Sequence, residues 1–284
     1  MTVRVALVTG CGKPDGMGQA IARTLARAGV TIVATDIAPR GEPNRGQAVS
    51  SSPASGLDAL VDEIARDGGR ASAVLGDISE VDDAQRMVDE AIDFGGRLDI
   101  LVNNAAAPQG EDRGDILDVP VEVWDRVIAV NLRGTFLMSR AVVPVMRTQH
   151  YGRIVNIASM AGIDALPHST SYSASKAGVL GFTRALAMDV GGWGITVNAV
   201  CPGLVWTSRG LLGVTSPDDE VAMRERRSAA IPVARVGAAD DIAAAVAYFA
   251  SEQAGYVTAQ ALPVDGGGIG AFPLPRPVQT GDLP

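Results

Sequence analysis

Tyr172 and Lys176 lie four residues apart in the run Tyr172-Ser173-Ala174-Ser175-Lys176. On a helix, this spacing places both side chains on one face, one turn from each other. A free tyrosine titrates near pH ~10, which is too high for easy proton exchange at neutral pH. Because a nearby ammonium favours the phenolate, it lowers the pKa of the tyrosine. The pair therefore predicts a general acid/base, although the same spacing also occurs by chance on many helices.

A glycine-rich segment, Thr9 to Gly18, connects the first predicted strand to the first predicted helix. Glycines permit a tight turn and let backbone N–H groups approach a pyrophosphate, which then faces the N-terminus of the helix. A simple strand-to-helix turn is the alternative. The position of the segment in the first strand–helix unit favours dinucleotide binding.

Asp36 ends the second predicted strand, eighteen residues after Gly18. A carboxylate there can accept hydrogen bonds from the adenosine ribose and repels a 2′-phosphate. No arginine follows it directly, and the residue before Gly16 is also acidic, so the sequence favours NAD over NADP. Lys13 and Arg40 argue the other way, since either can reach a phosphate. A solvated carboxylate at a strand end is the alternative for Asp36.

The rest of the chain alternates between apolar strand patterns and helical periodicity. Strands are expected over 3–9, 31–35, 71–75, 98–102, 153–158, 195–200 and 260–264. Helices are expected over 17–28, 57–67, 81–94, 121–148 (bent at Pro144), 172–190 and 240–250. This alternation predicts an α/β fold, a doubly wound, Rossmann-type parallel sheet of seven strands with helices on both faces. We expect one domain over 1–284, with an inserted loop (38–56), a partly helical substrate loop or lid (204–231) and a proline-rich tail (272–284).

The composition narrows the class of protein. Of 284 residues, 47% are apolar, and the net charge of −8 argues against a nucleic-acid partner. Two cysteines in a chain of this length favour a reducing, cytoplasmic setting over a disulfide framework. Two histidines with two cysteines give no clustered metal-ligand spacing, so we expect no metal. We also expect no signal peptide and no membrane span.

These motifs together resemble the short-chain dehydrogenase/reductase family. The matching residues are Thr9-Gly10, Gly16-Met17-Gly18, Asp77-Ile78, Asn103-Asn104-Ala105-Ala106, Asn131, Ser159, Tyr172 with Lys176, Pro202-Gly203 and Asp265-Gly266-Gly267. Two departures stand out. Five residues, not three, separate Gly10 from Gly16, and Ala106 replaces the usual glycine of the Asn-Asn-Ala-Gly motif.

The resemblance implies a role for each catalytic position. Tyr172 would be the acid/base, and Lys176 would lower its pKa and bind the nicotinamide ribose. Ser159 would hydrogen-bond the substrate oxygen. Asn131 would hold a water that relays protons from Lys176. A strand-end cap is the alternative for Ser159, and a buried helix residue bonded to a carbonyl is the alternative for Asn131.

The resemblance also implies a cofactor site. Its residues would be Gly10, Gly16, Met17 and Gly18 at the pyrophosphate, Asp36 and Asn104 at the ribose groups, Asp77 and Ile78 at the adenine, Tyr172 and Lys176 at the nicotinamide ribose, and Pro202, Gly203, Val205 and Thr207 around the carboxamide. Asn103 is expected to tie neighbouring strands together.

The sequence thus predicts an NAD-dependent oxidoreductase that interconverts a secondary alcohol and a ketone. The alternatives are an NADPH-dependent 3-oxoacyl reductase and a nucleotide-binding regulator without turnover. By analogy with the family, we expect a homotetramer, or failing that a homodimer, that pairs through the helices over 121–148 and 172–190. The substrate itself is not readable; its pocket is expected to be shaped by 108–115, 160–167 and 204–231.

Overall fold

A parallel sheet of seven strands forms the centre of the computed structural model, which describes residues 3–44, 56–164, 167–208 and 217–268. The strand order is β3-β2-β1-β4-β5-β6-β7, and every pair is parallel. The strands are β1 (Val5–Thr9), β2 (Thr31–Asp36), β3 (Ala71–Leu75), β4 (Ile100–Asn103), β5 (Gly152–Ile157), β6 (Ile195–Pro202) and β7 (Ala261–Val264). The predicted doubly wound fold is therefore confirmed.

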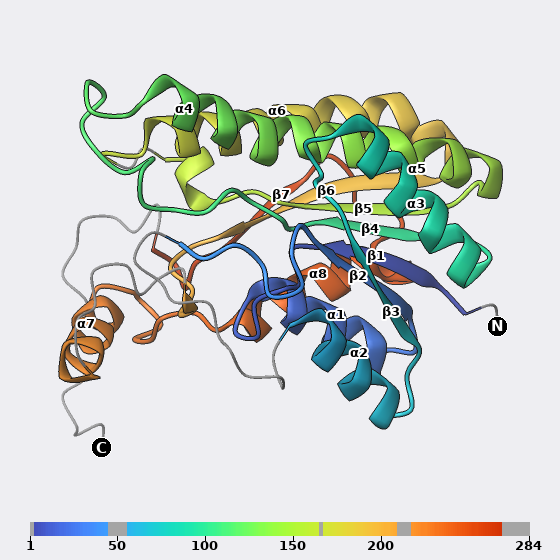
Figure 1. Cartoon of the computed structure of the whole chain (residues 1–284), viewed down its shortest axis with the longest axis horizontal. Coiled ribbons are helices and arrows are strands. Elements are labelled where there is room, and N and C mark those ends of the chain that lie inside the picture. The colour runs from blue at the N-terminus through green and yellow to red at the C-terminus, as the bar shows by residue number, and fades with distance from the viewer. Residues whose placement is uncertain (1–2, 45–55, 165–166, 209–216, 269–284) are drawn as a thin grey trace, which may run out of the picture.

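Helices cover both faces of this sheet (Figure 1). One face carries α3 (Val81–Gly95), α4 (Val121–Ile128), α5 (Thr135–Gln149) and α6 (Thr170–Val190). The other carries α1 (Met17–Arg27), α2 (Leu57–Arg66) and α8 (Ala239–Ala250). The sandwich forms because the central strands are buried on both sides, as in the fully buried β1, so each face needs an apolar helical cover.

The strand order reverses at β1, which lies between β2 and β4. In open parallel sheets, ligands bind in the crevice outside the carboxyl ends of the strands at such a reversal. All of the predicted motif residues that follow β1, β2, β4, β5 and β6 therefore converge at one edge of the sheet. Figure 1 shows α7 (Pro217–Ala229) beyond this same edge, clear of both helix layers.

The helix expected over 121–148 is divided, but not where we expected. A turn of π-helix, Ala129–Gly134, separates α4 from α5, whereas Pro144 lies within α5. In this turn, the Thr135 hydroxyl donates to the carbonyl of Asn131 at 2.8 Å. The side chain of Asn131 bonds to groups outside the helix, as described below. The departure from regular helical geometry therefore lies at the predicted functional asparagine, and π-helical turns are frequent at such sites.

Buried side-chain amides hold the central strands to the α5–α6 layer. Asn103 Nδ2, at the end of β4, donates to Asn156 Oδ1 on β5 at 2.8 Å and to Ser139 Oγ on α5 at 3.1 Å. Asn156 Nδ2 in turn donates to Thr183 Oγ1 on α6 at 2.9 Å. The expected role of Asn103 between strands is confirmed, and the network fixes α6 against the sheet.

Several sequence-based expectations lie partly outside the described residues. These are 45–55 of the inserted loop, 209–216 of the substrate loop or lid, 165–166, and the tail over 272–284. In the parts of the chain that the structure describes, no helix is long and apolar enough to cross a membrane. In those same parts, no group of three or more His, Cys, Asp or Glu side chains is arranged to hold a metal ion.

Candidate active site

Helix α6 carries the predicted acid/base pair near its N-terminus. It begins at Thr170, two residues before the start that periodicity predicted. Tyr172 is half-buried, whereas Lys176 is only 4% exposed. The Lys176 ammonium donates to the carbonyl of Ile157, the last residue of β5, at 2.7 Å, and lies 5.8 Å from the centroid of the Tyr172 ring. A buried ammonium is thereby fixed beside the tyrosine, as the four-residue spacing predicts.

Ser159 follows β5 by two residues and opens a short 3-10 turn, Met160–Gly162. Its hydroxyl accepts from the backbone N–H of Ala161 at 3.1 Å, so the capping role considered as an alternative is real. The capping bond uses the oxygen as an acceptor and leaves the hydroxyl proton available to a ligand. The turn packs on α6 because Gly162 has no side chain: a Cβ there would lie 2.7 Å from the backbone carbon of Lys176.

Asn131 connects three segments around this helix. Its side-chain oxygen accepts from the N–H of Ala107 at 2.9 Å, and its amide donates to Ser175 Oγ at 3.0 Å. The Ser175 hydroxyl donates to the carbonyl of Tyr172 at 2.7 Å. Asn131 is 1% exposed, so its structural role is established. Its expected role in holding a water stays a prediction.

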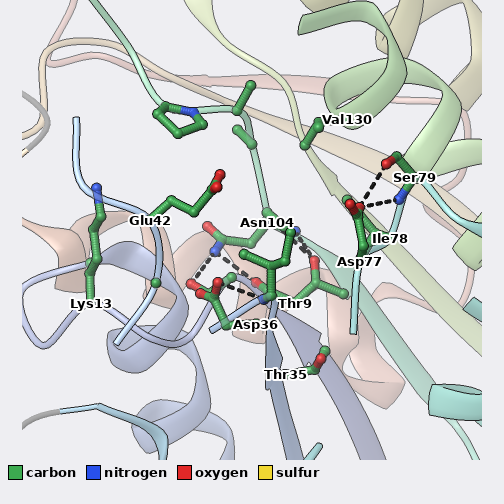
Figure 2. A pocket seen from close by; sticks show the side chains of 18 of the residues that line it. Thr9, Lys13, Thr35, Asp36, Glu42, Asp77, Ile78, Ser79, Asn104 and Val130 are labelled. Carbon is green, nitrogen blue, oxygen red and sulfur yellow. Dashed lines mark hydrogen bonds between the residues drawn. The ribbon is translucent and has the colours of Figure 1, made fainter. Parts of the chain in front are cut away.

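A pocket opens at the carboxyl ends of β1, β2 and β4 (Figure 2). Eight of the predicted cofactor residues line it: Gly10, Gly16, Met17, Asp36, Asp77, Ile78, Asn104 and Thr207. Six others do not: Gly18, Tyr172, Lys176, Pro202, Gly203 and Val205. Figure 2 places Lys13 and Glu42 on one side of the pocket, Asp77 and Ser79 on the other, and Asn104 between them.

The residues that do not line the pocket have packing roles around it. A Cβ on Gly18 would lie 2.2 Å from the carbonyl oxygen of Gly10, so α1 can approach the loop only with glycine there. The N–H of Gly203 donates to the carbonyl of Val264, and Val205 pairs with Gly237. The segment after β6 is thus held next to β7 and brings Thr207 to the pocket.

Asp36 closes the pocket at the end of β2. Its Oδ2 accepts from the N–H of Gly12 at 2.8 Å and its Oδ1 from the N–H of Ile37 at 2.8 Å. Burial raises the pKa of this carboxyl, while backbone N–H groups and the charge of Lys13 act in the opposite direction. Each oxygen can accept a second hydrogen bond, so the carboxylate can also bind hydroxyl groups of a ligand.

Asn104 provides a test of whether a nucleotide fits this pocket. Its amide donates to the carbonyls of Thr9 and Gly10 at 2.8 and 3.0 Å, but its side-chain oxygen is buried and accepts no hydrogen bond within the protein. A buried acceptor without a donor is costly. A hydroxyl donor from a bound ribose would satisfy it, so the residues present fit a nucleotide.

The long glycine loop and the segment after β2 pack against each other. A Cβ on Gly12 would lie 2.2 Å from the backbone nitrogen of Gly41, so both chains must pass without a side chain at Gly12. Within the loop, the N–H of Gly16 donates to the carbonyl of Lys13 at 3.0 Å and forms a tight turn. The two additional residues are therefore accommodated by a turn that rests on the segment following Asp36.

Residues 38–44, which we call the strap, continue across the pocket to the far wall. Glu42 accepts a forked ion pair from Arg126 Nη2 on α4 at 2.6 and 2.7 Å. Asn44, which is buried, accepts from the N–H of Gln109 at 3.0 Å. The chain then returns to its start, because the N–H of Leu57 donates to the carbonyl of Pro39 at 2.8 Å. Sequence reasoning did not identify Glu42 or Arg126, since nothing local relates residues 84 positions apart.

Comparison with known proteins decides the family. The profile of the family described as Enoyl-(Acyl carrier protein) reductase matches residues 10–268. The chain belongs to the short-chain dehydrogenase/reductase family. It is 37% identical to a 3-oxoacyl-[acyl-carrier-protein] reductase of Synechocystis over 268 residues, which cover 94% of this chain and 97% of the relative.

Solved structures of short-chain dehydrogenases/reductases superpose over nearly the whole chain. Levodione reductase is 31% identical, with a TM-score of 0.83, and the match covers 95% of this chain and 98% of that one. A variant of actinorhodin polyketide ketoreductase crystallised with NADPH is 33% identical, with a TM-score of 0.82 and the same coverage. The protein is therefore an oxidoreductase that acts on CH–OH groups of a small-molecule substrate with a nicotinamide cofactor.

Proposed function

We propose that this protein is an NAD-dependent oxidoreductase that interconverts a secondary alcohol and its ketone, with Tyr172 as the acid/base. The observation that carries the proposal is the buried Lys176 ammonium, fixed by the Ile157 carbonyl at 2.7 Å and 5.8 Å from the Tyr172 ring. Because the Lys176 ammonium is held in place, its charge stabilises the phenolate form of the neighbouring Tyr172.

The residues of the site divide the work of alcohol oxidation. A bound nicotinamide cofactor would supply the acceptor for the hydride of the carbinol carbon. Tyr172, as phenolate, accepts the proton of the substrate hydroxyl, and in ketone reduction it returns that proton. The Ser159 hydroxyl donates to the substrate oxygen, where negative charge develops. Lys176 keeps the tyrosine oxygen anionic between turnovers, and Asn131 holds the water that returns the proton to solvent.

The preference for NAD rests on the charges at the end of β2. Asp36 faces the pocket at the point where the strand ends, and Glu42 lies on the same side. Arg126 is already paired with Glu42 by two hydrogen bonds, so it is a poor partner for a 2′-phosphate. Lys13 lines the same pocket and favours the alternative, an NADPH-dependent 3-oxoacyl reductase. The relative from Synechocystis is named as a 3-oxoacyl-[acyl-carrier-protein] reductase.

A panel of secondary alcohols, each assayed with NAD and with NADP, tests the proposed function. Alcohol-dependent formation of NADH, with catalytic efficiency well above that for NADP, supports it. Efficient reduction of 3-oxoacyl thioesters with NADPH and no alcohol oxidation with NAD would instead support the alternative. Binding of the cofactor without turnover of either the alcohols or the 3-oxoacyl thioesters would favour a nucleotide-binding regulator.

The strap is expected to slow release of the cofactor. A variant that lacks residues 40–55 can be closed with a Gly-Ser link. It should fold because the ends of the deletion already lie together: the N–H of Leu57 donates to the carbonyl of Pro39 at 2.8 Å. Removal of the Glu42 and Asn44 contacts should accelerate NADH release by about tenfold, which corresponds to about 1.4 kcal/mol. Glu42→Gln is the matched control. It breaks one exposed ion pair worth about 0.2–1 kcal/mol, so NADH should leave about 1.4- to 5-fold faster.

Stopped-flow dissociation of NADH is the deciding measurement for the strap. An unchanged off-rate in the folded deletion variant would mean that the strap has another role. An equal acceleration in Glu42→Gln would place the whole effect in the ion pair.

We also propose a homotetramer, or failing that a homodimer, that pairs through α4–α5 and α6. Phe136 on α5 and Met188 on α6 are 45% and 69% exposed, and such apolar side chains on long helices favour a closed symmetric assembly. Light scattering at micromolar concentration is expected to report a tetramer or dimer, and a monomer alone would contradict this.

A further inference from the structure

An arginine from the loop between β4 and α4 lies against the predicted acid/base. The guanidinium carbon of Arg113 is 4.5 Å from the centroid of the Tyr172 ring. This is closer than the Lys176 ammonium, which is 5.8 Å from the same centroid. Arg113 belongs neither to the motifs that identify the family nor to the pocket described above. The tyrosine ring thus has one cation from its own helix and a second from a separate loop.

The guanidinium is held in place by two buried partners. Its Nε pairs with Asp112 Oδ2 at 3.3 Å, and its Nη1 donates to Ser169 Oγ. Asp112 is 2% exposed, and its other oxygen accepts from the N–H of Gly110 at 2.9 Å. Ser169 is 1% exposed and precedes α6, yet its side chain caps no backbone N–H of that helix. Both Asp112 and Ser169 therefore hold the Arg113 guanidinium. Asp112 lies in the same loop as Arg113, and Ser169 lies three residues before Tyr172.

Other charged or titratable groups lie on the elements that pack against this end of α6: Glu122, Asp125 and Arg126 on α4, Arg133 on the π-helical turn, Asp164 and His168 in the segment before α6, and Cys201 on β6.

These other groups have different environments. Arg126 is paired with Glu42, and Arg133 donates to the carbonyl of Ser79. Glu122, Asp125, Asp164 and His168 are exposed to solvent. Burial raises the pKa of the Cys201 thiol to about 11, so that group is neutral at pH 7. The Tyr172 ring thus contacts the cations of Lys176 and Arg113, and Asp112 pairs with the arginine.

We propose that Arg113 is a positioning residue for the acid/base: it clamps the Tyr172 ring from the side of the β4–α4 loop and stabilises the phenolate by its charge. This inference rests on the proposed function of Tyr172. A cation over the face of an aromatic ring is attracted by the ring quadrupole, and the attraction grows when the phenol oxygen becomes negative. The same loop is expected from the sequence to help form the substrate pocket, which would link the loop position to the protonation of Tyr172.

The test compares pH profiles of alcohol oxidation at saturating NAD. In Arg113→Met, which keeps much of the side-chain length but removes the charge, the acidic limb should move up by about one pH unit. Activity below that limb should fall about tenfold and recover at high pH. Arg113→Lys keeps the positive charge, so its acidic limb should lie close to that of the wild type. Arg70→Met is the matched control, because Arg70 also stacks on a ring, that of Phe94 at 4.2 Å, but far from this site.

A second readout does not depend on turnover. The chain has four tyrosines, so the ultraviolet absorbance of the phenolate, with the Tyr172→Phe signal subtracted, gives the titration of Tyr172 alone. It should move to higher pH in Arg113→Met. Unchanged titration in this variant, or an equal loss of activity at every pH, would overturn the inference while the proposed function stands. A wild type without a Tyr172-dependent acidic limb would overturn the proposed function first.

Discussion

Tyr172→Phe is expected to reduce turnover at least ~100-fold, the loss typical for removal of a general acid/base, and to leave NAD affinity within about threefold of wild type. Phenylalanine retains the ring against which Arg113 and Lys176 lie, so the local structure should persist. Only the oxygen that exchanges the proton is lost. Steady-state kinetics with the best alcohol of the panel, together with calorimetric titration of NAD, separates the two effects.

The control for this experiment is Tyr256→Phe, which removes the same atom from a fully exposed tyrosine. It should retain wild-type rates. A Tyr172→Phe variant that keeps more than about a tenth of wild-type activity would show that another group transfers the proton. An equal loss of NAD affinity would show instead that the substitution disrupts the site as a whole.

The sequence predicted the sheet well because the strands at its centre are short and buried. In β1 and β5, every residue is buried, and such runs between glycines or turns leave little choice of element. Helix boundaries were less accurate. The first turn of α6 contains Thr170 and Ser171, whose polar side chains resemble loop composition. The π-helical turn at Asn131 could not be read, because its cause is a set of bonds to Ala107, Ser175 and Thr135.

The relative positions of the candidate site residues were predictable where a single helix or strand holds them. Tyr172 and Lys176 share one helix, and Asp36 is the last residue of β2. Contacts between loops were not predictable. The ion pair of Glu42 with Arg126 and the stacking of Arg113 on Tyr172 each join segments that only the folded chain brings together. These contacts involve residues outside the motifs by which the sequence resembles its family, so the motifs alone did not point to them.

Asp36→Ala is expected to narrow the preference for NAD from both directions. A carboxylate about 5 Å from a phosphate charge costs about 3 kcal/mol at an effective dielectric constant of about 20, so NADP should gain about 100-fold from its removal. NAD should lose about 10-fold or more, since hydrogen bonds to a charged acceptor contribute about 1.5–3 kcal/mol. Ratios of kcat/KM for the two cofactors measure this directly.

The alanine variant also leaves the N–H groups of Gly12 and Ile37 without their acceptor, so Asp36→Asn, which keeps one acceptor oxygen, should be measured beside it. Both variants should shift the ratio of kcat/KM in the same direction. Asp77→Asn is the matched control from the opposite side of the pocket, where the carboxylate accepts from Ser79. It should change the two cofactors equally, because it lies away from the 2′ position. A wild type that uses NAD and NADP with similar efficiency, or a ratio unaltered by both Asp36 variants, would remove Asp36 from the basis of cofactor choice and leave Lys13 to decide it.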